Sequence, residues 1–200
     1  MSIKYAPSPR WSPPVRLVPS PDFIGEKSTA PIHEAVGRAL STWEHAESAL
    51  IKLYQLLCES ESLASCRSYG TIESVFGRHL ALKYAAEEFF MQRDHTNLKT
   101  VLALVKIYNE ASTYRNQIAH GMAMQPHSFG YFLCPASYSS RRRETPRPAV
   151  MWGFGASYFY RVSEIDNCAG HFTSILNGAM TLAMELNAKY KILAPGAFHP

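Results

Sequence analysis

The feature that most constrains the fold is an apolar stripe that repeats every three or four residues in three long segments. These segments span residues 32–58, 97–120 and 163–190. Residues three and four apart share one face of an α-helix, so each segment predicts a helix that buries one side. Residues 72–92 show a less regular version of the pattern and predict a further helix. The chain should therefore be mainly α-helical.

The stripe at residues 32–58 contains one charged residue among its seven positions. These positions are Val36, Leu40, Trp43, Glu47, Leu50, Tyr54 and Leu57. A carboxylate on a buried face is costly unless a cation or hydrogen-bond donors offset its desolvation. Arg115 falls on the stripe at residues 97–120, so its buried charge would also need a partner of opposite charge or hydrogen-bond acceptors. We therefore expect Glu47 to pair with Arg115 or to position it.

Residues that favour loops and helix starts separate these segments. The serine-rich stretch at residues 59–70 predicts a loop, and Thr71 is the expected N-cap of the helix that follows. Asn97 is the expected N-cap of the third helix. Ser163 and Asp166 have the spacing of a capping box, with aspartate in place of the usual glutamate, and should open the last helix.

Proline sets residues 1–31 apart from the rest of the chain. The prolines of this arm are Pro7, Pro9, Pro13, Pro14, Pro19, Pro21 and Pro31. Proline fixes φ and removes a backbone donor, so the arm cannot form a regular helix or a central strand. Its apolar residues, Trp11 and Phe23 among them, favour an extended arm that lies along the domain or a partner subunit over a disordered leader.

Between the third and fourth predicted helices the pattern changes to short aromatic and β-branched runs. Three such runs, at residues 129–133, 150–154 and 157–162, predict a small antiparallel sheet. The predicted fold is therefore mainly α, with a four-helix core in a domain at residues 32–200. It carries a β insertion at about residues 127–162 and the proline-rich arm.

Composition limits the partners, cofactors and cellular compartment that we expect for the protein. A net charge of +4 permits an acidic partner such as RNA without requiring one. The four cysteines form no C-x-x-C pair and join no histidine pair at zinc-finger spacing, so we expect reduced thiols and no metal. No G-x-x-x-x-G-K-S/T or G-x-G-x-x-G loop occurs, so we expect no other cofactor. The sequence shows no basic and apolar leader and no run of about 18 apolar residues. We expect a cytoplasmic protein that does not span a membrane.

One hexapeptide, Arg115-Asn116-Gln117-Ile118-Ala119-His120, ends the third predicted helix, and Gly121 follows it at once. Glycine takes the left-handed conformation that commonly terminates a helix, so the helix should end at His120. On a regular helix Asn116 and His120 lie about 40° apart, whereas Arg115 and His120 lie roughly 140° apart. A second copy across a twofold axis would gather two arginines and two histidines in one cleft. The spacing thus favours a homodimeric site.

These residue types suit proton transfer beside a phosphate. A histidine exchanges protons near neutral pH, and the planar fork of an arginine stabilises charge on phosphate oxygens. Asn116 can bind phosphate or ribose, or fix the ring of His120. Arg115, Asn116 and His120 also make a sound C-terminal helix cap with no chemical role, and that alternative stays open.

Arg115, Asn116 and His120 resemble the R-N-x-x-x-H signature of the HEPN family, the helical domains named from higher eukaryotes and prokaryotes nucleotide-binding. Residues 32–190 also fit, loosely, the helical bundle of that family. The resemblance implies a dimer with both motifs at its interface and metal-independent cleavage of RNA. It implies that the arginine and histidine are catalytic.

The resemblance also suggests a biological setting and an alternative. Similar domains are toxins, abortive-infection factors and defence ribonucleases, which implies a toxin, phage-defence or stress role with an antitoxin or regulatory protein as a partner. Other family members have lost catalysis. A non-catalytic module that binds RNA, nucleotide or protein is therefore the alternative function, and a structural dimer in a stress or phage-defence complex is a third.

A second basic feature lies in the predicted β insertion. The connection at residues 139–147 carries Arg141, Arg142, Arg143 and Arg147. Arginines bind phosphates, and neighbouring aromatic residues can stack on bases. The four arginines are candidate RNA-binding residues, although a solvated loop explains the run slightly better.

Overall fold

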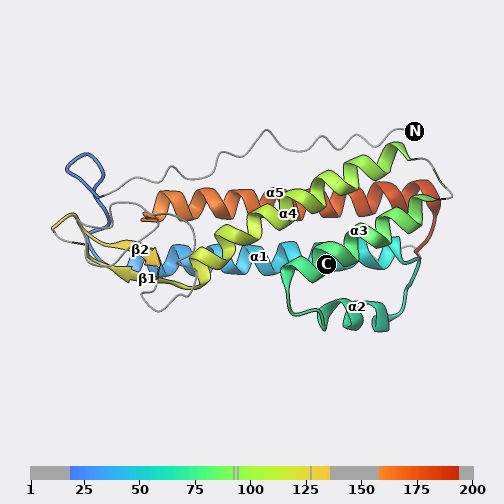
Figure 1. The fold of residues 1–200 in the computed structure, drawn as a ribbon, viewed down its shortest axis with the longest axis horizontal. Coiled ribbons are helices and arrows are strands. Elements are labelled where there is room, and N and C mark those ends of the chain that lie inside the picture. Colours follow the sequence, from blue (N-terminus) through green and yellow to red (C-terminus); the bar gives the residue numbers. More distant parts are fainter. Residues whose placement is uncertain (1–18, 92, 94, 127, 136–157, 194–200) are drawn as a thin grey trace. The chain divides into compact units, whose positions relative to one another are not determined.

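The computed structural model describes residues 19–91, 93, 95–126, 128–135 and 158–193. This part of the chain is mainly helical and holds a small two-stranded antiparallel sheet, as predicted at this level (Figure 1). Its helices are α1 (Ala30–Leu57), α2 (Leu63–Gly70), α3 (Val75–Met91), α4 (Thr96–Ala119) and α5 (Val162–Tyr190). Its strands are β1 (Gly121–Met124) and β2 (Phe132–Pro135). No helix in the described residues is both long and apolar enough to cross a membrane.

The three long helices confirm the predictions made from periodicity, whereas the segments around α2 do not. The stretch at residues 59–70 was expected to be a loop, but Ser62 caps a helix there by accepting a hydrogen bond from the N–H of Ala64 at 3.1 Å. Thr71 lies at the C-terminus of α2 instead of capping α3. Ser74 takes that role, because its hydroxyl accepts from the N–H of Gly77 at 3.0 Å.

The N-terminus of α5 is also built differently from the expectation. Ser163 was the predicted cap, but the helix begins at Val162. The carboxylate of Glu164 reaches back to accept the N–H of Arg161 at 2.9 Å and also binds its guanidinium. Burial opposes ionisation of Glu164, but the hydrogen bonds from Arg161 outweigh it, so the pKa of this carboxyl is lowered.

The chain divides into two compact units. In the described residues, the first comprises 42–113 and 171–193, and the second comprises 19–41, 114–135 and 158–170. Aromatic rings from three helices form the core of the first unit. The ring of Trp43 stacks on Tyr108 with centroids 5.3 Å apart and meets Phe172 edge-on at 5.1 Å. Large buried rings of this kind supply much of the hydrophobic stabilisation of a domain.

The second unit holds the sheet and the described part of the arm. Strand β1 pairs antiparallel with β2, so that Gly121 faces Pro135 and Met124 faces Phe132. The predicted strand at residues 129–133 is thus shifted toward the C-terminus, and its partner β1 was not predicted. Of the run at residues 157–162, Tyr160 forms a single bridge with Leu133. The run at residues 150–154 lies outside the described residues.

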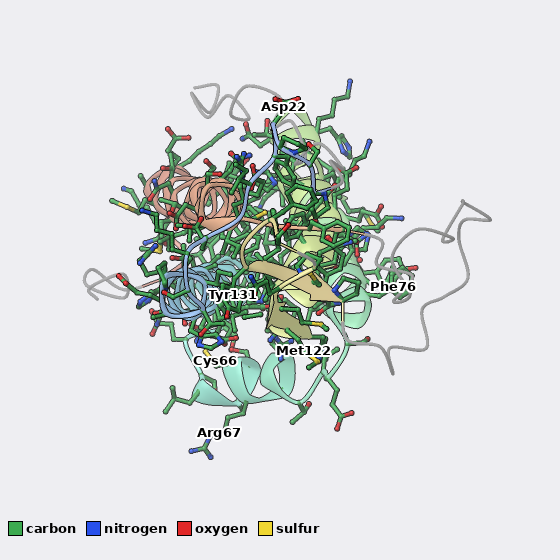
Figure 2. The ribbon with its side chains drawn as sticks, turned by 90° about the vertical axis from the view of Figure 1, so that its left-hand side faces the viewer. Asp22, Cys66, Arg67, Phe76, Met122 and Tyr131 are labelled. Carbon is green, nitrogen blue, oxygen red and sulfur yellow. The ribbon has the colours of Figure 1, made fainter. Side chains whose placement is uncertain are left out.

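Residues 19–29 of the arm pack on this sheet, whereas residues 30 and 31, which were also assigned to the arm, begin α1. The N–H of Glu26 donates to the carbonyl of Tyr131 at 2.8 Å, and the reverse bond has the same length. Phe23 joins a buried cluster with Phe132, Cys134 and Phe159. In the view of Figure 2, Tyr131 lies beside the strands, near the start of α1.

Gly121 marks the junction of α4 with the sheet. It was expected to adopt a left-handed conformation after the helix, but it begins β1 and its φ is not positive. The reason for glycine here is close approach. A Cβ atom at this position would lie 2.7 Å from Cγ of Leu133 and 3.0 Å from the carbonyl oxygen of Gln117.

We expect Gly121→Ala to destabilise the protein by about 1–3 kcal/mol, because Leu133 or the end of α4 must move to admit the methyl group. Gly37→Ala is the control, since a Cβ there meets nothing within 4 Å in the middle of α1. It should stabilise the protein by roughly 0.5–1 kcal/mol through helix propensity. Urea unfolding of both variants checks the prediction, and equal midpoints would contradict it.

Candidate functional site

The predicted site residues lie at the C-terminal end of α4, within the second unit. Arg115 and Asn116 belong to its last turn, and His120 follows the helix directly. The N–H of His120 donates to the carbonyl of Asn116 at 3.1 Å, which is the i to i−4 pattern of an α-helix. His120 therefore keeps the helical register, and its side chain is exposed.

The structure brings two of the three side chains together. Nη1 of Arg115 donates to Oδ1 of Asn116 at 3.3 Å, and both residues are partly buried. The imidazole of His120 is exposed at the end of the helix, one residue beyond Ala119. On a regular helix, Arg115 and His120 face directions roughly 140° apart.

Two buried tyrosines fix the helix end that carries these residues. The hydroxyl of Tyr158 donates to the backbone carbonyl of Gln117 at 2.8 Å, and the hydroxyl of Tyr160 donates to the side-chain Oε1 of Gln117. Their rings stack with centroids 4.8 Å apart. Burial, followed by the nearby Cys134 thiol, raises the pKa of Tyr158, so its hydroxyl stays protonated as a donor. We call Gln117, Tyr158 and Tyr160 the tyrosine clamp.

The clamp is continuous with the sheet. The backbone of Tyr160 exchanges two hydrogen bonds with Leu133, at 2.8 and 3.0 Å. Leu133 in turn pairs with Ala123 of β1 and lies against Gly121. The last turn of α4 is thus held by Tyr158 and Tyr160, which precede α5. The strand that follows α4, β1, is held by its pairing with β2.

Sequence reasoning did not identify the clamp. Gln117 lies inside the motif but was given no role, and its partners are 41 and 43 residues away along the chain. A signal was present, because Tyr158 and Tyr160 alternate in a run that was predicted to be extended. Alternate residues of an extended segment point to the same side, so both hydroxyls can reach one residue.

Glu47 has a different partner from the one that was predicted. Its Oε1 accepts a hydrogen bond from the hydroxyl of Tyr108 at 2.8 Å, and Nη1 of Arg78 lies 3.1 Å from its Oε2. All three residues belong to the first unit, and Glu47 is buried. Burial lowers the pKa of the Arg78 guanidinium, but the charge of Glu47 outweighs this effect and the pKa is raised. The cation beside Glu47 is thus Arg78, not the expected Arg115.

The structure describes only some of the remaining candidate residues. Arg141, Arg142, Arg143 and Arg147 lie outside the described residues. Among the residues that are described, no three histidine, cysteine, aspartate or glutamate side chains converge as metal ligands would. Two of the four cysteines, Cys134 and Cys168, are buried, and burial raises the pKa of each thiol to about 12. These two thiols are packing groups.

No protein-family model, curated protein or solved structure matches this chain. The likeness to the HEPN family therefore rests on Arg115, Asn116 and His120 and on the helical pattern around them.

We expect Tyr160→Phe to loosen the end of α4, because the substitution leaves Oε1 of Gln117 without its donor. The loss should cost about 1–2 kcal/mol in the free energy of unfolding, the usual range for a buried partner left unsatisfied. Amide hydrogen exchange at residues 116–121 should become faster. Tyr84→Phe serves as the control, since Tyr84 is exposed on α3. If the two variants protect residues 116–121 equally, the clamp does not hold the helix.

We expect Glu47→Ala to lower the free energy of unfolding by ~3 kcal/mol, because it leaves the Arg78 cation without its buried counter-charge. Tyr108→Phe should cost about 1 kcal/mol, since only one hydrogen bond is lost. Glu88→Ala removes an exposed carboxylate of the same unit and should change stability by less than about 0.5 kcal/mol. Thermal unfolding of the three variants measures the difference. A Glu47→Ala protein as stable as Glu88→Ala would instead point to a role for Glu47 outside packing.

Proposed function

We propose that this protein is a HEPN-like helical domain that cleaves single-stranded or looped RNA without a metal and acts as a homodimer. The observation that carries the proposal is the exposed imidazole of His120, in helical register with Arg115 and Asn116 at an end of α4 that the tyrosine clamp holds. A guanidinium that contacts Asn116 and an accessible imidazole on the same helix end are groups that suit phosphoryl transfer, because positioning supplies much of the rate enhancement.

The proposed reaction is attack of a ribose 2′-hydroxyl on the adjacent phosphorus. The new bond joins the 2′ oxygen to phosphorus, and the bond from phosphorus to the 5′ oxygen breaks. His120 takes the 2′ proton or supplies the proton that the leaving 5′ oxygen needs. Arg115 stabilises the charge that develops on the phosphate oxygens, and Asn116 orients Arg115 or contacts the ribose. The products are a 2′,3′-cyclic phosphate end and a 5′-hydroxyl end.

The separation of Arg115 from His120 supports a shared site in a dimer. On one helix these residues face directions roughly 140° apart, so one protomer does not readily aim both at a single phosphate. A twofold axis next to the end of α4 would supply the missing group from a second copy. The arginines at positions 141, 142, 143 and 147 are proposed as further contacts to RNA.

The alternative is a non-catalytic module that binds RNA, nucleotide or protein at the same helix end. The angle of roughly 140° between Arg115 and His120 on one helix favours this reading if the protein works as a monomer. In either case we propose a toxin, phage-defence or stress role in the cytoplasm, with an antitoxin or regulatory protein as a partner.

Cleavage of labelled RNA in the presence of a chelator tests the proposal. His120→Ala and Arg115→Ala should each lower the cleavage rate by roughly 10²–10⁴-fold, the usual contribution of one acid–base or charge-stabilising group. His45→Ala, an exposed histidine of α1, is the matched control and should cleave at the parent rate. The cleaved 5′ fragment should end in a cyclic phosphate.

The possible outcomes separate the two functions. Cleavage that disappears in both site variants but not in His45→Ala supports the enzyme. RNA binding without cleavage by the parent protein supports the module. Cleavage that persists unchanged in His120→Ala contradicts the assignment of this residue.

A further inference from the structure

Strand β1 is the free edge of the small sheet in the second unit. On the far side of β2, Leu133 exchanges two backbone hydrogen bonds with Tyr160, at 2.8 and 3.0 Å. Tyr131, two residues earlier on the same side, exchanges two with Glu26, both 2.8 Å long. Among the described residues, β1 pairs with β2 alone. One edge of the sheet is thus occupied and the edge at β1 is open.

The ladder determines which backbone groups of β1 point outward. Residues opposite each other in an antiparallel pair alternate between those that exchange two hydrogen bonds and those that exchange none. Leu133 turns its bonding groups toward Tyr160, so Ala123, which lies opposite Leu133, belongs to the second kind. The N–H and the carbonyl of Ala123 therefore point away from β2, and no described residue bonds to them.

A second extended polypeptide is the partner that fits these two groups. An antiparallel strand presents a carbonyl and an N–H to the same residue, and extended peptides commonly bind exposed sheet edges in this way. Phosphate oxygens only accept hydrogen bonds, so the phosphates of RNA can satisfy the N–H but not the carbonyl. Charged residues or proline usually protect an exposed edge, but β1 reads Gly-Met-Ala-Met, and Met122 is 45% exposed.

The charges near this edge favour an acidic peptide. Residues 111–135 contain no aspartate or glutamate, and Arg115 and His120 lie just before β1. Glu26 and Glu164, in the same unit, already bind donors at the start of α5. The surroundings of β1 are thus complementary to a partner that carries a carboxylate, because opposite charges steer and orient an encounter.

We propose that β1 binds an extended acidic segment of a partner protein as an added antiparallel strand. The main chain of this segment pairs with Ala123. Because the two strands run in opposite directions, the residue three positions later in the segment lies beside His120, and we assign the carboxylate to that position. Such a segment would compete with RNA at the end of α4. The competition rests on the proposed function, whereas the binding of the segment does not.

The added strand should bind weakly. Strand β1 has four residues, and interfaces that bury less than about 1,200 Å² are typical of transient complexes. We therefore expect a dissociation constant on the order of tens to hundreds of micromolar for an isolated peptide.

A matched pair of N-methylated peptides tests the pairing on the parent protein. The probe is a blocked, fluorescein-labelled peptide of alternating valine and threonine that ends in glutamate, and fluorescence anisotropy follows its binding. Methylation of the nitrogen three residues before the glutamate removes the donor to the carbonyl of Ala123 and should raise the dissociation constant about tenfold. Methylation one residue later changes an N–H that points away from β1, so the constant should stay within about twofold of the unmethylated value.

Variants of Ala123 test the same contact from the protein side. Ala123→Pro removes the outward N–H and no bond to β2, and proline is tolerated on an edge strand where the N–H faces solvent. It should weaken binding of the unmethylated peptide about tenfold. Ala123→Ser keeps the backbone donor and should bind within about twofold of the parent protein.

Three results overturn the proposal. The first is equal binding of the two methylated peptides, and the second is no binding of the unmethylated peptide at millimolar concentration. The third is a parent dimer in sedimentation that dissociates in Ala123→Pro, because a second copy of the chain then occupies the edge. None of these measurements contains RNA, so failure here is distinct from failure of the cleavage assay.

Discussion

Two tyrosine hydroxyls on one glutamine hold the end of α4, and the candidate site depends on that contact. A helix leaves its last four carbonyl groups without partners inside the helix, and the carbonyl of Gln117 is one of them. Tyr158 satisfies it, while Tyr160 binds the side chain of the same residue. A helix terminus normally frays, so a buried double contact of this kind limits the motion of the groups carried beside it.

The Glu47–Arg78 pair and the end of α4 are two polar centres, and they differ in their exposure to solvent. In the pair of Glu47 with Arg78, Glu47 is buried in the first unit and accepts a hydrogen bond from Tyr108, whereas Arg78 is partly exposed. The end of α4 in the second unit is partly open, with His120 exposed. An ion pair with a buried partner acts on stability, because removing one partner strands the other charge. An open imidazole can meet a ligand.

Periodicity made the long helices predictable, because each buries a continuous stripe whose spacing is visible in the sequence. Helix α2 was missed because it is short, serine-rich and contributes a single buried residue, Tyr69. Strand β1 was missed because Gly-Met-Ala-Met contains no β-branched residue. It pairs with β2, and Leu133 of β2 approaches Gly121 so closely that a Cβ atom would not fit, a contact that no local pattern encodes. The site residues Arg115, Asn116 and His120 were named from their spacing, whereas Tyr158 and Tyr160 lie too far along the chain for any spacing rule.

We propose that the clamped end of α4 contacts the RNA backbone. Nuclear magnetic resonance titration with a short single-stranded RNA tests it most directly, if every 2′ oxygen is methylated so that no cleavage can occur. We expect the side-chain signals of Arg115 and His120 to shift together and saturate, and both shifts to weaken as salt is raised. Shifts confined to other parts of the protein, with residues 115–121 unchanged at saturation, would contradict it.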